Sequence, residues 1–233
     1  AWLNDACIHF FFTVLSKRLQ QDGNNNNNNN TTNKFMDPSV VSFLMHQCQD
    51  EQDEQDFRSG WEDTSSSERI FIPINDNFGS GSLLYPGAGS HWSLLVLLLQ
   101  QPQQPQDGND NKIINKKSIH DCFHFDSHSS GSSNNHEAAS NVAKKMQRVL
   151  GLEKLQIPVT ECSMPQQQNG YDCGLYMIAA AEALSLGSPQ QQQQQQYTTR
   201  AEQEIILRQH LGNDTAPRMR KKILDLVKEL AHT

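Results

Sequence analysis

The stretch that decides the fold covers residues 165–186 and reads PQQQNGYDCGLYMIAAAEALSL. Its first part is polar and predicts a turn. From Gly174 onward nearly every residue is apolar, which is typical of a helix that is buried on all sides. Cys173 therefore stands at or near the start of a buried helix, where the partial positive charge of the helix end favours a thiolate. Taken alone, Cys173 is better explained as a small buried residue at the start of a core helix.

The rest of the chain predicts one sheet with helices before and after it. Residues 91–99, HWSLLVLLL, are typical of a strand buried on both faces. Further β-rich runs predict strands at 69–74, 118–125 and 155–160. Apolar residues at helical spacing predict helices at 3–19, 38–47, 137–150, 199–211 and 216–230, and 49–67 indicates a loop or short helix. This order of elements predicts an α+β domain.

Three polar stretches interrupt this pattern. Residues 24–30 are seven asparagines, residues 190–196 are seven glutamines, and residues 100–111 mix Gln, Pro, Asp, Gly and Asn. Such tracts have little apolar surface to bury, so ordering them is not compensated. We therefore expect a single domain over residues 1–233, with disordered inserts near 21–33, 100–117 and 188–197.

Composition excludes several classes of protein. A formal net charge of −7 argues against nucleic acid as a partner and favours a basic partner surface. The sequence contains no run of eighteen apolar residues, so no membrane span is predicted. The five cysteines are widely spaced, which suits a reducing cytoplasmic or nuclear compartment. The chain starts with Ala rather than Met, so we expect a trimmed piece of a longer protein. We also expect a monomer that needs no cofactor.

Three further residues stand where a thiol nucleophile needs them. A cysteine nucleophile requires a base for its proton and donors for the oxyanion that forms on the attacked carbonyl. His91 begins one predicted strand and Asp126 follows another, so a shared sheet edge can bring them together. An Asp behind an imidazole holds its tautomer and stabilises the imidazolium. Gln167 lies in the polar turn before Cys173 and can donate its amide to an oxyanion.

Four sequence blocks together resemble the Ulp/sentrin-specific cysteine proteases. The blocks are WLND at 2–5, HWSL at 91–94, FDS at 125–127 and QQNGYDCG at 167–174. They occur in the order His, Asp, Cys that is typical of this family, and the resemblance spans nearly the whole chain. It implies a papain-like (adenain-like) cysteine protease fold with a central mixed sheet flanked by helices.

The resemblance also implies a role for each matching residue. Cys173 would be the nucleophile, His91 the general base and acid, Asp126 the orienting group and Gln167 the oxyanion donor. Further implied roles are in binding the substrate: Trp2 and Trp92 wall a narrow tunnel over a Gly-Gly tail, and Asp5 faces the surface of the ubiquitin-like modifier.

Within the family, the deneddylase branch is the most similar. The residues that resemble this branch are FIPINDN at 71–77, FHFDSHS at 123–129 and NGYDCG at 169–174. The implied substrate is therefore the neddylation modifier, either as a conjugate or as a precursor, with SUMO as the alternative. The sequence departs from the branch in the three polar inserts and in a longer loop at 78–90.

Other functions remain as alternatives. The chain could bind the modifier without cutting it, or could transfer an acyl group, because related folds use the same triad for acetylation. His120, His124 and His128 recur every four residues, which in a helix would suggest a metal site. In a strand this spacing spreads them over about 13 Å, so we expect no metal there.

Overall fold

The computed structural model describes residues 3–25, 32–60, 67–78, 89–100, 118–128, 135–150, 157–187 and 199–231. Its five strands form one sheet in the order β1-β2-β3-β4-β5. The two outer pairs are parallel, and the central strand runs antiparallel to its neighbours on both sides. The strands are β1 (Thr32–Phe35), β2 (Ser67–Asn75), β3 (Trp92–Gln100), β4 (Ser118–Phe125) and β5 (Val159–Cys162). The sheet is therefore mixed, and the predicted α+β class is confirmed.

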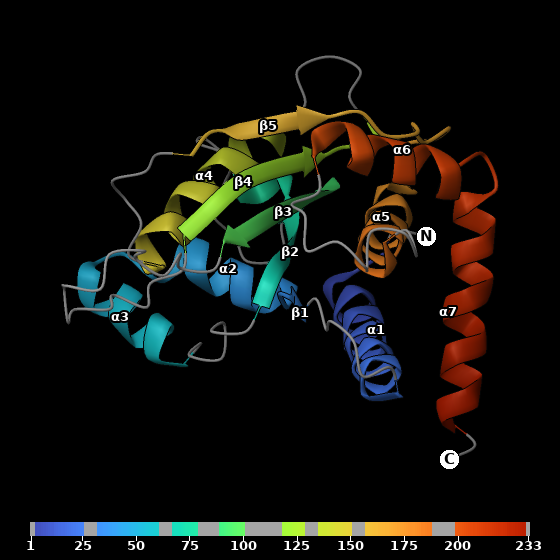
Figure 1. The fold of residues 1–233 in the computed structure, drawn as a ribbon, viewed down its shortest axis with the longest axis horizontal. Coiled ribbons are helices and arrows are strands. Elements are labelled where there is room, and N and C mark those ends of the chain that lie inside the picture. The colour runs from blue at the N-terminus through green and yellow to red at the C-terminus, as the bar shows by residue number, and fades with distance from the viewer. Residues whose placement is uncertain are drawn as a thin grey trace, which may run out of the picture.

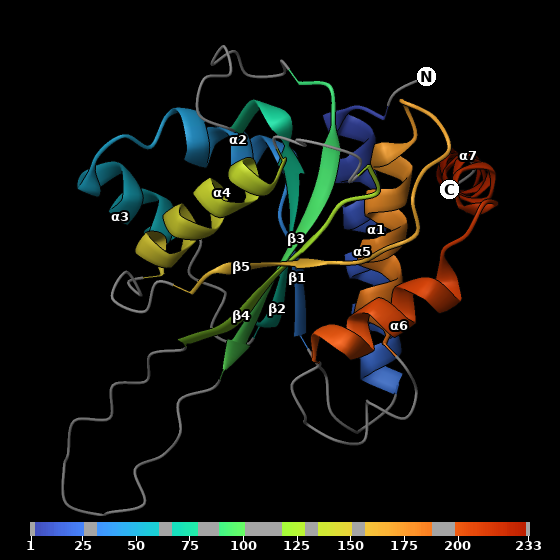
Figure 2. The ribbon, with the colours of Figure 1, turned by 90° about the horizontal axis from the view of Figure 1, so that it is seen from above.

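Helices cover both faces of this sheet (Figures 1 and 2). On one side lie α2 (Pro38–His46), α3 (Glu51–Gly60) and α4 (Asn135–Val149). On the other side lie α1 (Asp5–Asn25), α5 (Cys173–Leu186), α6 (Arg200–His210) and α7 (Thr215–Ala231). A single 3-10 turn, η1 (Asp76–Phe78), directly follows β2. None of the helices in the described ranges has the length and apolar character needed to cross a membrane.

Side chains of the central strand alternate between two hydrophobic cores. Leu94, Val96 and Leu98 of β3 belong to the core that contains α1, α5, α6 and α7. Leu95 and Leu97 point to the opposite side and pack with residues of α2 and α4. Because successive side chains of a strand face opposite ways, an almost wholly apolar run requires apolar cover on both faces. The apolar run at 91–99 thus corresponds to the central strand of the sheet.

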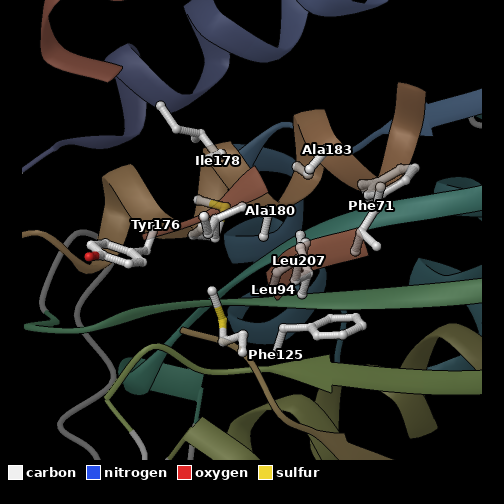
Figure 3. Close-up of a cluster of buried hydrophobic side chains, with 14 of the residues drawn as sticks. Phe71, Leu94, Phe125, Tyr176, Ile178, Ala180, Ala183 and Leu207 are labelled. Carbon is white, nitrogen blue, oxygen red and sulfur yellow. The ribbon is translucent and has the colours of Figure 1, made fainter. Parts of the chain in front are cut away.

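Helix α5 is the centre of the first core. Of its 14 residues, 12 are buried, which matches its lack of a polar face. Figure 3 shows Ala180 and Ala183 facing strand residues such as Phe71 and Leu94, while Ile178 points away from the sheet. The small alanine side chains let this helix lie close to the strands. This packing places the first residue of α5 at a defined position against the sheet edge.

The structure corrects several expected boundaries. Helix α1 continues to Asn25 and β1 starts at Thr32, so the insert expected at 21–33 is ordered at both ends. Strand β1 was not predicted, because a four-residue edge strand beside an Asn tract has few apolar residues. Strand β5 ends two residues later than predicted, at Cys162. The remaining parts of the three inserts, at 26–31, 101–117 and 188–198, lie outside the described residues.

Candidate active site

The start of β3 and the end of β4 lie at the same edge of the sheet. These strands are antiparallel, and Leu94 pairs with Phe125. His91 directly precedes β3 and Asp126 directly follows β4. The antiparallel register therefore brings together two residues that are 35 positions apart in the sequence, as predicted from their places at the strand ends.

The His91 imidazole and the Asp126 carboxylate form a buried hydrogen-bonded pair. His91 Nε2 lies 2.7 Å from Asp126 Oδ1, which also accepts a hydrogen bond from the backbone N–H of His128 at 2.8 Å. The Asp126 side chain is 3% exposed and that of His91 15%. Burial acts to raise the pKa of Asp126, but the His91 hydrogen bond and charge outweigh it and lower this pKa. The carboxylate is therefore ionised and orients the imidazole.

Cys173 is the first residue of α5, and its side chain interacts with the imidazole of His91. Because Nε2 of His91 faces Asp126, Nδ1 is the ring nitrogen left for the thiol. Burial lowers the pKa of His91, yet the hydrogen bonds and charges of Asp126 and Cys173 outweigh it and raise this pKa to about 10. The arrangement thus favours an imidazolium beside the sulfur of Cys173, which stands at the partly positive N-terminal end of α5.

Gln167 is held beside these residues by the turn that precedes α5. Its backbone N–H donates to the Ser127 carbonyl at 2.9 Å, and its Oε1 accepts from the Ser127 hydroxyl at 2.8 Å. Its Nε2 donates to the Asn169 carbonyl. An amide NH₂ has two N–H groups, so a second one remains for a substrate oxyanion. Ser127 directly follows Asp126, but no role was predicted for it from the sequence.

Trp92 lies close to Gly174 at the start of α5 and to Leu3, which precedes α1. Its indole N–H donates to the Leu3 carbonyl at 3.2 Å. A Cβ placed on Gly174 would lie 2.8 Å from Leu3 Cβ and 3.5 Å from Trp92 Cδ1. Only a glycine therefore fits next to the nucleophile without displacing Leu3. Trp92 also belongs to the hydrophobic core, since the residue is 6% exposed.

The other two substrate-binding residues expected from the resemblance are Asp5 and Trp2. Asp5 is exposed in the first turn of α1, so its carboxylate is accessible from outside. Trp2 lies outside the described residues, so its place in a tunnel stays a prediction. The longer loop predicted at 78–90 also falls largely outside them, at 79–88.

An ion pair that no sequence pattern indicates lies next to Cys173, at the start of α5. Asp172, the residue before Cys173, accepts hydrogen bonds from Arg220 of α7 and, at 2.7 Å, from Asn169 Nδ2. Arg220 is 48 positions further along the chain, so nothing local in the sequence relates the two. The start of α5 is thus tied to the last helix and to the turn that carries Gln167.

The histidines spaced four apart do not converge, but one of them joins a different cluster. His124 of β4, His136 of α4 and Glu161 of β5 have side-chain atoms within 4.8 Å of one another, a set that could hold a metal ion. One assignment of protons satisfies the histidines without a metal. Ser93 donates to His124 Nε2 at 2.8 Å, and both histidines donate from Nδ1 to Glu161. These bonds lower the pKa of Glu161 although burial acts to raise it.

A thiol at a helix start, an imidazole beside it and a carboxylate behind that imidazole define a class of enzyme, the cysteine proteases. The sequence places the chain within this class. Residues 1–231 match the Ulp1 protease family, C-terminal catalytic domain. The chain belongs to this family and is a cysteine protease.

Individual relatives agree with this assignment. Human sentrin-specific protease 8 is 31% identical over 184 residues, which cover 79% of this chain and 71% of the human protein. NEDD8-specific protease 1 of Arabidopsis thaliana is 25% identical over 234 residues, 98% of this chain and 84% of the plant protein. A solved structure of a de-sumoylating protease is 16% identical and aligns with a TM-score of 0.57 over 99% of this chain and 85% of its own. That likeness shows the shared fold.

Proposed function

We propose that this protease cleaves after the C-terminal Gly-Gly of the neddylation modifier, with Cys173 as nucleophile. The observation that carries the proposal is the buried chain of contacts from Asp126 through His91 to Cys173 at one edge of the sheet. The reaction releases either an amine of a conjugated protein or a peptide that follows the modifier in its precursor.

The proposed chemistry is carried out by Cys173, His91 and Gln167, while Asp126 orients His91. The Cys173 thiolate attacks the carbonyl carbon of the last glycine and forms a carbon–sulfur bond. Gln167 Nε2 and the Cys173 backbone N–H donate to the resulting oxyanion. When the carbon–nitrogen bond breaks, the His91 imidazolium protonates the departing amine. Water then attacks the thioester with His91 as the base, which releases the modifier's carboxylate and restores the thiol.

The crowded contact of Trp92, Leu3 and Gly174 supports a glycine tail as the substrate. A flat indole lets an extended glycine backbone pass and leaves no room for a Cβ. Beside the sulfur, even a methyl group on Gly174 would collide with Leu3, so the described residues are tightly packed here. A tail of two glycines, which has no Cβ, suits such a crowded surface better than larger residues at the cleaved bond.

The choice of modifier rests on the relatives and on sequence blocks. Two relatives carry names that specify the modifier or the branch, sentrin-specific protease 8 and NEDD8-specific protease 1. The segments at 71–77 and 123–129 resemble the same branch. The exposed carboxylate of Asp5 and the net charge of −7 suit a modifier surface with basic side chains.

The test is a comparison of cleavage rates for the neddylation modifier, SUMO and ubiquitin, each with a C-terminal fluorogenic amide. We expect a strong preference for the first. Cys173→Ala should bind the modifier but not cut it, whereas Cys48→Ala, which changes a buried cysteine in the opposite core, should retain activity. A preference for SUMO would overturn the modifier assignment alone, and cleavage by Cys173→Ala would overturn the nucleophile.

A further inference from the structure

The backbone that carries the proposed general base is held by one carboxylate, that of Asp76. Its Oδ1 accepts hydrogen bonds from the backbone N–H of Ser90 at 2.8 Å and of His91 at 3.2 Å. Its Oδ2 accepts from the Ser90 hydroxyl at 2.7 Å. In return, the backbone N–H of Asp76 donates to the His91 carbonyl at 3.2 Å. We call these four bonds the Asp76 clamp.

The clamp acts where the sheet no longer holds the chain. Asn75 and Trp92 form the last residue pair between β2 and β3, so His91 lies one residue beyond the ladder. Within the described part of the chain, the backbone bonds recorded for His91 both go to Asp76. Hydrogen bonds to a charged acceptor are roughly twice as strong as neutral ones. Asp76 is therefore placed to decide where the His91 backbone sits.

A glycine next to the clamp sets the path of the same segment. Gly89 has a φ of +154°, a backbone conformation that residues with a side chain rarely adopt. A Cβ at this position would lie only 1.8 Å from Asn75 Oδ1. That oxygen is itself bonded to the backbone N–H of Asn77 at 3.0 Å, so it is not free to move away. The end of β2 thus positions the segment by both a close contact and the clamp.

We propose that Asp76 is a positioning residue for catalysis, which keeps the His91 imidazole between Asp126 and Cys173. The proposal rests on the proposed role of His91. Without the clamp, the backbone of His91 can shift relative to β4 and α5, which hold the other two residues. A shift of ~1 Å in a catalytic group costs on the order of 100-fold in rate, because proton transfer and attack require close geometry. The carboxylate itself touches no reacting atom.

The experiment compares Asp76→Ala with Asp76→Asn, Gly89→Ala and a control. Asp53→Ala is the matched control, because Asp53 also accepts from two consecutive backbone N–H groups, of Gln49 and Asp50, but at the start of α3. For each variant we would measure the melting temperature, kcat and KM on the fluorogenic neddylation modifier. We would also measure the rate at which iodoacetamide alkylates Cys173, read from the mass of its peptide. The alkylation rate depends on the thiolate–imidazolium pair, and it can be measured without any modifier.

For Asp76→Ala and Gly89→Ala, we expect kcat and the alkylation rate to fall together by about 10- to 100-fold, with little change in KM. Asp76→Asn keeps an oxygen acceptor and should recover part of both rates. Asp53→Ala should change at most the melting temperature.

Two results would overturn the proposal: native alkylation and kcat in Asp76→Ala, or an Asp76→Asn variant as slow as Asp76→Ala. If the native protein cleaves none of the modifiers, the proposed function fails. The clamp is then judged from the alkylation rates alone.

Discussion

Replacing Asp126 by Asn should separate the charge of this residue from its shape. Asn keeps the size and can still accept a hydrogen bond from His91 Nε2, but it carries no charge. Burial lowers the pKa of His91, and the Asp126 and Cys173 interactions raise it from 6.5 to about 10. That difference corresponds to about 5 kcal/mol in favour of the imidazolium, at ~1.4 kcal/mol per pKa unit. Without the Asp126 charge, the pKa of His91 must fall.

The assay is the pH dependence of kcat/KM on the fluorogenic modifier. The imidazolium protonates the leaving amine, so activity is lost as pH rises through the pKa of His91. We expect this alkaline limb near pH 10 in the native protein and lower by at least about one pH unit in Asp126→Asn. At neutral pH the rate should fall by about 100- to 10,000-fold, the range that general acid–base catalysis contributes.

The same substitution should change the free energy of unfolding in a defined pH window. A raised His91 pKa stabilises the fold fully below pH 6.5, and this contribution is lost as pH rises through about 10. A lowered Asp126 pKa stabilises the fold above pH 3.8, its ordinary value, and this contribution is lost as pH falls below it. The native protein should therefore exceed Asp126→Asn in stability most between pH 3.8 and 6.5.

Asp121→Asn provides the matched control, because Asp121 also pairs with a histidine, His120, but on an exposed part of β4. Its pH profile should equal that of the native protein. An alkaline limb that is the same in Asp126→Asn and in the native protein would refute the reasoning, because Asp126 would then not stabilise the imidazolium.

Two further substitutions test the oxyanion donor and the core. Gln167→Ala should lower kcat by about 100- to 1,000-fold with KM little changed, because the amide bonds an oxygen charged only in the transition state; steady-state kinetics measures both. Leu207→Ala, at a fully buried position of α6, should lower the free energy of unfolding by about 2–5 kcal/mol in a urea titration.

Each of these substitutions has a control of the same residue type. Gln168 is the exposed neighbour of Gln167, and Gln168→Ala should leave kcat at the native value. Leu224 of α7 is 52% exposed, so Leu224→Ala should change stability by no more than about 0.5 kcal/mol. Equal rates in the two glutamine variants would remove Gln167 from the proposed mechanism. Equal stabilities in the two leucine variants would contradict the core described for α5 and α6.

Much of the fold was predictable, because most elements carry their own periodic signal. The apolar run at 91–99 predicted a central strand, and the apolar helix after Cys173 predicted the buried α5. The proximity of His91 and Asp126 was predicted from their positions at strand ends. Strand β1 was not predictable, because Phe35 is the one apolar side chain among its four residues, and a single apolar residue gives no periodic pattern.

The sequence by itself determined which chemical groups are available and where each lies along a strand, turn or helix. Only the tertiary structure decided which distant groups support them. Arg220 reaches Asp172 because α7 packs against α5, and Asp76 reaches His91 because β2 and β3 are antiparallel. The physical reason is that hydrogen bonds act over about 3 Å in space, whatever the separation along the chain. Local sequence patterns determine which secondary structure a segment forms, whereas the path of the chain determines which other segments it contacts.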